Sequence, residues 1–207
     1  MLDFDGTLGD TTGVIIRTTQ ATIKELGLPS RTDEQCAAMI GLRLVEIPPV
    51  LFPECNIDVN LYAQIYRKNF NIFNIRGAVN LYPNVKETLS ELKNKGIVLT
   101  IASSRSKNSL TEYITDLNLA EYISYIIGGD DVSEGKPNPE AVNRTLEKFG
   151  FMPEDALMVG DTVFDIHMCR NAGTHTCGVT YGNGTKESMA DATWLIDDFS
   201  ELLHIMA

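Results

Sequence analysis

Short apolar runs alternate with helix-like segments from about residue 80 to the end of this 207-residue chain. The apolar runs, which we expect to be strands, are residues 97–102, 122–127, 156–159, 175–179 and 194–196. Apolar residues recur at helical spacing in residues 83–95, 110–117, 138–149 and 164–172, and again from residue 199. Strands that alternate with helices predict an α/β fold with a doubly wound, Rossmann-like parallel sheet that helices cover on both faces.

Residues 12–79 have a different pattern. Apolar residues at helical spacing predict helices over 14–26 and 60–75, with shorter helical pieces around 33–39 and 43–51. No strand is expected between them. The sequence therefore predicts an α/β core domain, formed by residues 1–11 and 80–207, and an inserted all-helical domain, formed by residues 12–79.

The chain is acidic, with 28 aspartates and glutamates against 17 lysines and arginines and a formal net charge of −11. Nucleic-acid binding normally requires a basic surface, so we expect no nucleic-acid partner. No stretch approaches the roughly 18 consecutive apolar residues of a membrane helix, and we expect no membrane partner either. An acidic chain repels a phosphate ester at long range. Any phosphate site must therefore be a local cationic pocket, in which we expect a bound metal.

The four cysteines are Cys36, Cys55, Cys169 and Cys177, and no two have C-x-x-C spacing. Reduced, partly buried thiols of a cytoplasmic protein are the expected state. The N-terminus lacks the basic and apolar regions of a signal peptide, which agrees with a cytoplasmic location. We expect a monomer or a homodimer.

Polar residues follow several of the expected strands. Asp3, Asp5, Gly6 and Thr7 follow a first strand that is expected to be short, since only Met1 and Leu2 precede Asp3. Ser103 and Ser104 follow the next strand, Gly160, Asp161, Thr162 and Asp165 follow a later one, and Lys136 lies in a loop before a helix. Ligands of an open parallel sheet bind outside the carboxyl ends of its strands. We therefore expect these groups to lie together on one edge.

The chemistry of this set is specific. Carboxylates crowded together repel one another unless a cation offsets their charge, and hard oxygen ligands suit Mg²⁺. A carboxylate can also attack a phosphoryl group in line and form an aspartyl-phosphate. A second acid two residues further on can reach the leaving oxygen, while a lysine and a hydroxyl bind the phosphoryl oxygens. The set predicts Mg²⁺-dependent phosphoryl transfer.

Four motifs together resemble those of the haloacid dehalogenase superfamily. The first is Asp3-Phe-Asp5-Gly6-Thr7-Leu8, Ser103 and Lys136 match the second and third, and Gly160-Asp161-Thr-Val-Phe-Asp165 matches the fourth. The resemblance spans essentially the whole chain. It is closest to the phosphoglycolate phosphatase and β-phosphoglucomutase branch, whose helical cap is inserted after the first motif, and it implies that residues 12–79 are a cap.

The resemblance also implies a role for each motif residue. Asp3 would be the nucleophile, and Asp5 would protonate the leaving group and then activate water. Asp3, the backbone carbonyl of Asp5 and the side chain of Asp161 would hold Mg²⁺, with Asp165 in support through water or by pairing with Lys136. Ser103 and Lys136 would bind the phosphoryl group, helped by the amides of Gly6 and Ser104. An aspartate at position 5 favours phosphoryl transfer, because true dehalogenases lack it.

Two arginines are candidate specificity residues. Arg43 lies where related caps carry a substrate-specificity loop, and it either meets a second anionic group of the substrate or is a surface residue at a helix start. Arg105 is close to the site in sequence and either contacts the substrate or faces solvent. The segment Gly182-Asn-Gly184-Thr-Lys186 superficially looks like a phosphate loop, but its lysine does not follow the second glycine, so we discard it.

The favoured function is a Mg²⁺-dependent phosphatase that hydrolyses a small phosphorylated metabolite, either phosphoglycolate-like or a sugar phosphate. A phosphomutase returns the phosphoryl group to its substrate with the same residues and is the alternative. A non-enzymatic phosphoacceptor of the receiver type also uses carboxylates, a hydroxyl and a lysine on a doubly wound sheet. Its phosphorylated aspartate follows a later strand and it needs no inserted helical domain, so that class is disfavoured.

Overall fold

A parallel sheet lies at the centre of the computed structural model, which describes residues 1–206. Its strands are β3 (Thr100–Ala102), β4 (Tyr125–Ile127), β5 (Leu157–Gly160), β6 (His175–Val179) and β7 (Trp194–Ile196). β4 pairs with β3, and β5, β6 and β7 pair in that order, always in parallel. Leu2 joins the two groups, because it forms parallel bridges to Ile101 of β3 and Val159 of β5. The predicted first strand is therefore as short as expected.

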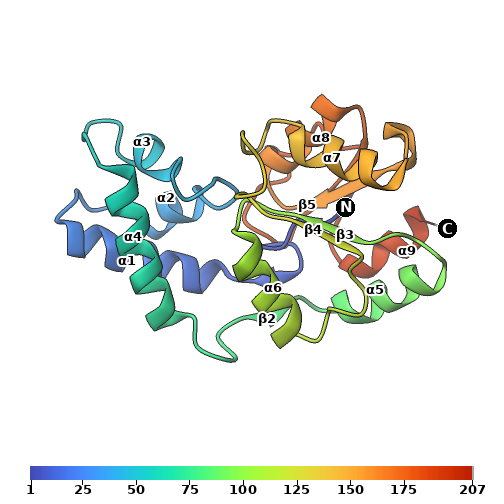
Figure 1. Cartoon of the computed structure of the whole chain (residues 1–207), viewed down its shortest axis with the longest axis horizontal. Helices are drawn as coiled ribbons and strands as arrows, with labels where there is room; N and C mark the ends of the chain where they lie inside the picture. The colour runs from blue at the N-terminus through green and yellow to red at the C-terminus, as the bar shows by residue number, and fades with distance from the viewer. Residues whose placement is uncertain (207) are drawn as a thin grey trace.

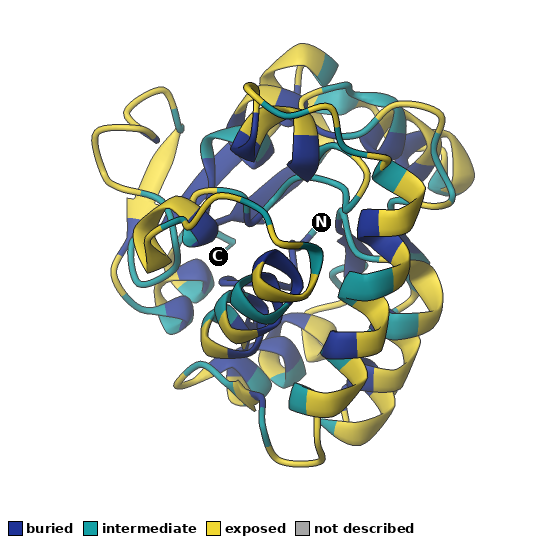
Figure 2. Ribbon diagram, turned by 90° about the vertical axis from the view of Figure 1, so that its left-hand side faces the viewer, coloured by how far each residue is buried: buried dark blue, intermediate teal, exposed yellow. Residues whose placement is uncertain are grey.

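Helices cover both faces of the sheet, as predicted (Figure 1). One face carries α5 (Val85–Asn94), α6 (Lys107–Asp116) and α9 (Leu202–Ile205), and the other carries α7 (Glu140–Phe149) and α8 (Val163–Ala172). Two 3-10 turns, η1 (Pro153–Asp155) and η2 (Phe199–Glu201), complete this part. Phe4 and Ile101 belong to the apolar cluster of the first face, and Ile127 and Met158 to that of the second. The sheet is thus the middle layer of three, and its strands β3, β5 and most of β6 are buried, whereas β7 at the edge is largely exposed (Figure 2).

Local sequence explains where several helices end. Gly27 ends α1 (Thr12–Leu26) and Gly173 ends α8, each with a positive φ, 63° and 77° respectively. The left-handed conformation is accessible to glycine at little cost, and it lets the backbone amide of the cap residue bond the last carbonyls of the helix. Both helices therefore end as the sequence predicts.

A group of four helices lies beside the α/β part (Figure 1). α1 packs along α4 (Val59–Phe73), and the short helices α2 (Asp33–Ala37) and α3 (Ile47–Leu51) lie between them in the chain. Phe52 and Tyr62 belong to an apolar cluster that is separate from the two clusters of the sheet. This helical segment with its own core agrees with the sequence pattern. None of the helices in residues 1–206 has the length and apolar character needed to span a bilayer.

Several details differ from the sequence-based expectation. β3 and β4 are each three residues shorter than the apolar runs 97–102 and 122–127. Residues 43–46 form a turn instead of the start of a helix, and in it the amide of Arg43 donates to Glu46 Oε2 (2.9 Å). A two-stranded antiparallel ribbon, β1 (Gly9–Asp10) with β2 (Asn80–Leu81), is not predicted. It lies where the chain leaves the α/β part and where it returns, so the two crossings are side by side.

Candidate active site

Asp3, Asp161, Asp165 and Lys136 meet at the carboxyl edge of the sheet. The amide of Asp3 donates to the carbonyl of Val159 (2.9 Å), which fixes Asp3 beside β5. The ammonium of Lys136 donates to Asp3 Oδ1 (2.6 Å) and to Asp165 Oδ1 (2.5 Å). All four side chains are buried. The fold therefore gathers residues that are far apart in the sequence, as their positions after the strands predict.

Charge in this cluster is unbalanced, because three carboxylates face one ammonium. Burial, together with repulsion from Asp165, raises the pKa of Asp161 to about 7. Burial also raises the pKa of Asp3 against the opposing attraction of Lys136, and the neighbouring carboxylates raise it further. Burial alone would lower the pKa of Lys136, but Asp165 and Asp3 together raise it. The cluster therefore has less positive than negative charge.

The three carboxylates are placed to hold a metal ion. One oxygen from each of Asp3, Asp161 and Asp165 lies within 4.8 Å of the other two. Carboxylate oxygens are the ligands that suit Mg²⁺, and a divalent cation would offset the repulsion between carboxylates that, after burial, contributes to these raised pKa values. The donor set therefore fits the cation expected from the sequence.

The loop around Asn183 holds Asp161. Asn183 donates from its amide (2.7 Å) and from Nδ2 (2.8 Å) to Asp161 Oδ2. Gly182 and Gly184 permit this approach, because a Cβ at either position would lie within 2.3 Å of an Asp161 atom. Sequence reasoning missed Asn183. The two glycines around it were the available signal, because glycine marks close approach of a backbone.

Asp165 has a second role at the start of α8. Its Oδ2 accepts hydrogen bonds from the amide (3.1 Å) and the hydroxyl (2.7 Å) of Thr162, the N-cap residue of this helix, and the bond from the amide is one half of a capping box. Its other oxygen accepts from Lys136. Pairing with Lys136 is one of the two roles expected of Asp165.

Asp5 is paired with Arg105. Nε of Arg105 donates to Asp5 Oδ2 (3.1 Å) and Nη2 donates to Oδ1 (2.6 Å). Each of these two side chains is only 11% exposed. The guanidinium carbon lies 5.1 Å from the ring centroid of Phe70 in α4 and 5.0 Å from that of Tyr113 in α6. The alternative in which Arg105 faces solvent is therefore wrong.

A cavity of about 660 Å³ opens beside Asp3 and Asp5. Residues 39–45, Ile47 and α4 of the helical segment line one side of it, and residues 103–106, 108–109 and 129–130 line the other. Its volume suits a small metabolite. The cavity is thus formed by both parts of the molecule.

The expected phosphate-binding groups have different surroundings. Ser103 is buried at the edge of the sheet and lines the cavity. Ser104 also lines it, but its hydroxyl donates to the carbonyl of Gly41 (2.6 Å) and so ties the loop after β3 to the helical segment. The amide of Gly6 donates to the carbonyl of Gly9 (2.9 Å), within the turn that follows Asp5. In this structure the Gly6 amide is therefore used by the turn itself.

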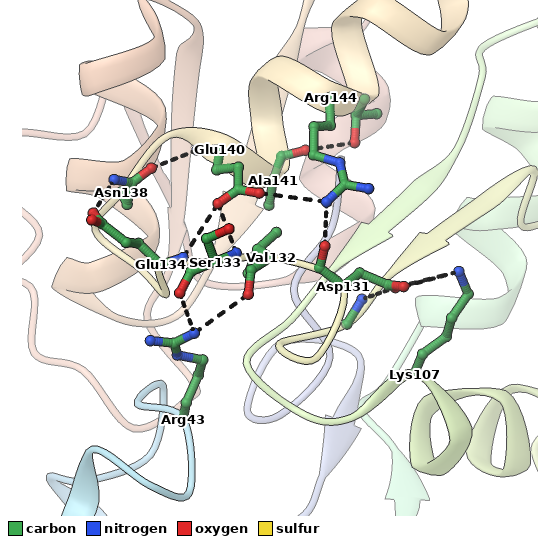
Figure 3. A network of polar contacts seen from close by, with 12 residues as sticks. Arg43, Lys107, Asp131, Val132, Ser133, Glu134, Asn138, Glu140, Ala141 and Arg144 are labelled. Carbon is green, nitrogen blue, oxygen red and sulfur yellow. Dashed lines mark hydrogen bonds and ion pairs between the residues drawn. The ribbon is translucent and has the colours of Figure 1, made fainter.

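Arg43 connects the helical segment to a loop of the α/β part (Figure 3). Its Nη1 donates to the carbonyls of Val132 (3.5 Å) and Ser133 (3.0 Å), and its Nε donates to Glu46 Oε1 (2.8 Å). Arg43 also lines the cavity. It is therefore not a solvated surface residue, and its expected contact with an anionic group of the substrate stays a prediction.

The chain is similar in sequence to known phosphatases. Residues 1–179 match the family of haloacid dehalogenase-like hydrolases. A phosphoglycolate phosphatase of Vibrio parahaemolyticus is 32% identical, with 99% of this chain and 94% of that protein covered. A phosphoglycolate phosphatase of Aquifex aeolicus is 35% identical, with 88% of this chain and 84% of that protein covered.

Solved structures agree with these sequence relatives. A haloacid dehalogenase-like hydrolase from Bacteroides fragilis superposes with a TM-score of 0.91 at 27% identity and covers 97% of each chain. A predicted phosphoglycolate phosphatase from Haemophilus somnus superposes with a TM-score of 0.84 at 26% identity, covering 100% of this chain and 96% of its own. Because the family match spans most of the residues and the relatives are phosphatases, the chain belongs to the haloacid dehalogenase-like hydrolases and is a phosphatase.

Proposed function

We propose that this chain is a Mg²⁺-dependent phosphatase that hydrolyses a small phosphorylated metabolite through an aspartyl-phosphate at Asp3. The observation that carries the proposal is the buried contact of Asp3 with Lys136, inside a group of three carboxylates beside a cavity. It supports the proposal, because the candidate nucleophile, the candidate phosphate-binding cation and the candidate metal ligands lie close together. The relatives at 32% and 35% identity are named phosphoglycolate phosphatases, which favours phosphoglycolate as the substrate. A sugar phosphate is the other substrate expected from the sequence.

In the first step, a carboxylate oxygen of Asp3 attacks phosphorus in line with the ester bond. The bond from Asp3 to phosphorus forms while the ester P–O bond breaks, and the leaving oxygen takes a proton from the carboxyl of Asp5. Lys136 and Ser103 bind the phosphoryl oxygens as charge develops on them. The alcohol then leaves through the cavity.

In the second step, Asp5 acts as a base. It takes a proton from water while the water oxygen attacks phosphorus and the bond to Asp3 breaks. Inorganic phosphate leaves, and Asp3 returns to its carboxylate form. Asp5 is protonated again and ready to act as the acid.

Asp3, Asp161 and the backbone carbonyl of Asp5 would hold Mg²⁺, and Asp165 would support the site through Lys136. When bound, the ion supplies the positive charge that buried carboxylates otherwise lack and stabilises charge on the transferring group. Burial and the neighbouring Asp165 raise the pKa of Asp161 to about 7, which supports the proposal that this site takes an added positive charge.

We also propose that residues 12–79 act as a cap over a core domain of residues 1–11 and 80–207. The helical segment has its own apolar cluster and forms one side of the cavity. A cap in this place would exclude bulk water from the phosphoryl group during transfer. Arg43, which connects the two parts, would then stabilise the closed arrangement.

Two further expectations stay predictions. The monomeric or homodimeric state is one. The cytoplasmic location is the other, and the unpaired state of Cys36, Cys55, Cys169 and Cys177 in the described residues supports it.

The test is a screen of the purified protein against phosphorylated metabolites, including phosphoglycolate and hexose phosphates, with phosphate release as the readout. We expect hydrolysis that EDTA abolishes and Mg²⁺ restores, and a loss of more than about a thousandfold in Asp3→Asn. Retention of activity in Asp3→Asn would exclude the proposed nucleophile. Isomerisation of a hexose 1-phosphate without phosphate release would favour the phosphomutase.

A further inference from the structure

Arg105 is held on several sides by protein groups. Three of its five N–H groups are used within the protein, two by the carboxylate of Asp5 and one by Ser109 Oγ (3.1 Å). Its guanidinium also lies over the rings of Phe70 and Tyr113. Arg105 is therefore fixed by four side chains, which come from the turn after the first strand, from α6 and from α4.

The aromatic rings next to Arg105 continue into the core. Tyr113 stacks on Phe4, with ring centroids 5.1 Å apart and 23° between the ring planes. Phe4 is fully buried and immediately precedes Asp5 in the chain. The hydroxyl of Tyr113 also donates to Oδ1 of Asn74, the residue that follows α4. Arg105 thus packs against side chains that connect the core of the sheet, through Phe4 and Tyr113, to the helical segment.

We propose that Arg105 is a positioning residue that holds the carboxyl of Asp5 in the orientation needed for proton transfer, and that α4 takes part through Phe70. A guanidinium that pairs with both oxygens of a carboxyl group fixes its position and its plane. Orientation matters because a general acid or base must be within hydrogen-bond reach of the reacting oxygen. This inference rests on the proposed role of Asp5 as acid and base.

Phe70 makes this arrangement depend on the helical segment. It belongs to α4, whereas Asp5, Ser109 and Tyr113 belong to the α/β part. Displacement of α4 would remove one of the two rings that pack against Arg105. We therefore expect Asp5 to be fully aligned only while the helical segment lies over the site.

The test uses phenyl phosphate and 4-nitrophenyl phosphate, two substrates of the same charge. Nitrophenolate leaves without a proton far more readily than phenolate, so phenyl phosphate depends more strongly on an aligned acid. The value of kcat/KM covers the transfer to Asp3, in which the leaving group departs. We expect Arg105→Met to lower kcat/KM for phenyl phosphate about tenfold more than for 4-nitrophenyl phosphate. Arg105→Lys keeps the charge without the planar fork and should show a smaller shift in the same direction.

Four further variants make the result specific. Asp5→Asn is the reference for loss of the acid, and adding Arg105→Met to it should cause little further loss, because both changes affect one step. Phe70→Leu should shift the ratio of the two substrates in the same direction without removing a charge. Arg67→Met is the matched control, because Arg67 lines the same cavity but forms no ion pair in residues 1–206. We expect it to leave the ratio unchanged.

A binding measurement separates positioning from substrate recognition. Calorimetry should give the same affinity for phosphoglycolate in Asp3→Asn and in Asp3→Asn combined with Arg105→Met. Weaker binding, with equal losses of kcat/KM for both aryl phosphates, would show that Arg105 binds substrate and would overturn the inference. If Asp5→Asn itself leaves the ratio unchanged, the proposed role of Asp5 fails instead. Should Arg105→Met not fold, as judged by circular dichroism, Arg105→Lys and Phe70→Leu carry the same test.

Discussion

Lys136 shows how a charged group can be kept inside an acidic site. It is 7% exposed, and each of its two bonds goes to a carboxylate oxygen. Charge-assisted bonds of this kind offset the loss of hydration that burial causes. One ammonium cannot balance three carboxylates. The carboxylate that Lys136 does not contact, Asp161, therefore depends on other side chains to hold it in place. Asn183 is the clearest of these, because both of its donors are directed at Asp161.

Replacement of Asn183 by alanine should weaken metal binding more than catalysis. Loss of the Nδ2–H bond removes one of the groups that orient Asp161, and partners of metal ligands typically contribute about tenfold or more to affinity. The activity of Asn183→Ala, titrated with Mg²⁺, should reach a similar maximum at an about tenfold higher metal concentration. Lys186→Ala is the control, because Lys186 lies in the same loop and pairs with Asp197 (2.8 Å). An unchanged midpoint in Asn183→Ala would contradict a supporting role.

The carboxylate cluster should make stability depend on pH. The pKa of Asp161 is about 7 in the folded protein, against 3.8 for an ordinary aspartate. The folded protein thus binds this proton more tightly than the unfolded chain, so stability falls as pH rises from about 4 through 7. Bound Mg²⁺ replaces the proton, and its stabilising effect should therefore grow over the same range.

Thermal unfolding measures this dependence. In EDTA, we expect the midpoint temperature of unfolding to decrease as the pH is raised from about 5 to about 8. The increase in this temperature caused by Mg²⁺ should be larger at the higher pH. Asp161→Asn should reduce both effects, because its side chain does not titrate. A Mg²⁺ effect that is larger at the lower pH would rule out the explanation.

Elements with a regular apolar pattern are predicted well from the sequence. β6 and β7 occupy residues 175–179 and 194–196, the ranges expected for them. β3 starts later than its apolar run, at Thr100, and its middle residue, Ile101, is the one that Leu2 bridges. β1 and β2 are not predictable in this way, because strands of two residues carry no periodicity. Their pairing depends on where two distant parts of the chain cross.

Some residues of the candidate site can likewise be predicted from the sequence and others cannot. The meeting of Asp3, Asp161 and Lys136 is predictable, because the sequence pattern reveals the order of the strands and loops that carry them. The burial of Arg105 does not follow from that order, because it depends on Phe70 of α4 and on how the helical segment packs. Contacts between the two parts of the molecule carry no local sequence signal.

The helical segment should be destabilised by a single core change. Phe52 is fully buried in the cluster of this segment, and Arg31 lies over its ring, 4.5 Å from the centroid. Phe52→Ala is expected to lower the free energy of unfolding by about 3–5 kcal/mol. Hydrogen exchange should rise more in α1–α4 than in the sheet, because the clusters are separate. Val50→Ala is the control, since Val50 is 53% exposed. An equal rise in both parts would show that they unfold as one unit.

The net negative charge of the protein opposes the binding of its proposed substrate. The chain has a net charge of −11, whereas its proposed substrate is an anion. In the proposed mechanism, attraction to the phosphoryl group comes from Lys136 and Mg²⁺ at short range, while the net negative charge of the protein repels the substrate at longer range. Salt weakens such long-range repulsion, because the Debye length falls to about 10 Å at 0.1 M ionic strength.

Catalysis should therefore become more efficient as salt is added. We expect kcat/KM to increase when the ionic strength is raised from about 0.01 to 0.1 M at saturating Mg²⁺, because the repulsion is screened over that range. Most of the change should be in KM. Initial rates at several substrate concentrations measure it, and a steady decrease would show that local attraction to the site dominates.

The ribbon of β1 and β2 also bears on how such a protein can change over time. It pairs Gly9 with Leu81 and Asp10 with Asn80, so the two ends of the inserted segment are neighbours. A turn of about two residues can join antiparallel strands at such a point. A lineage could thus shorten, enlarge or exchange the insertion without altering the sheet or the proposed metal ligands Asp3 and Asp161. The proposed cap and the carboxylates of the candidate active site are encoded in separable stretches of the gene, so each stretch can diversify while the other is conserved.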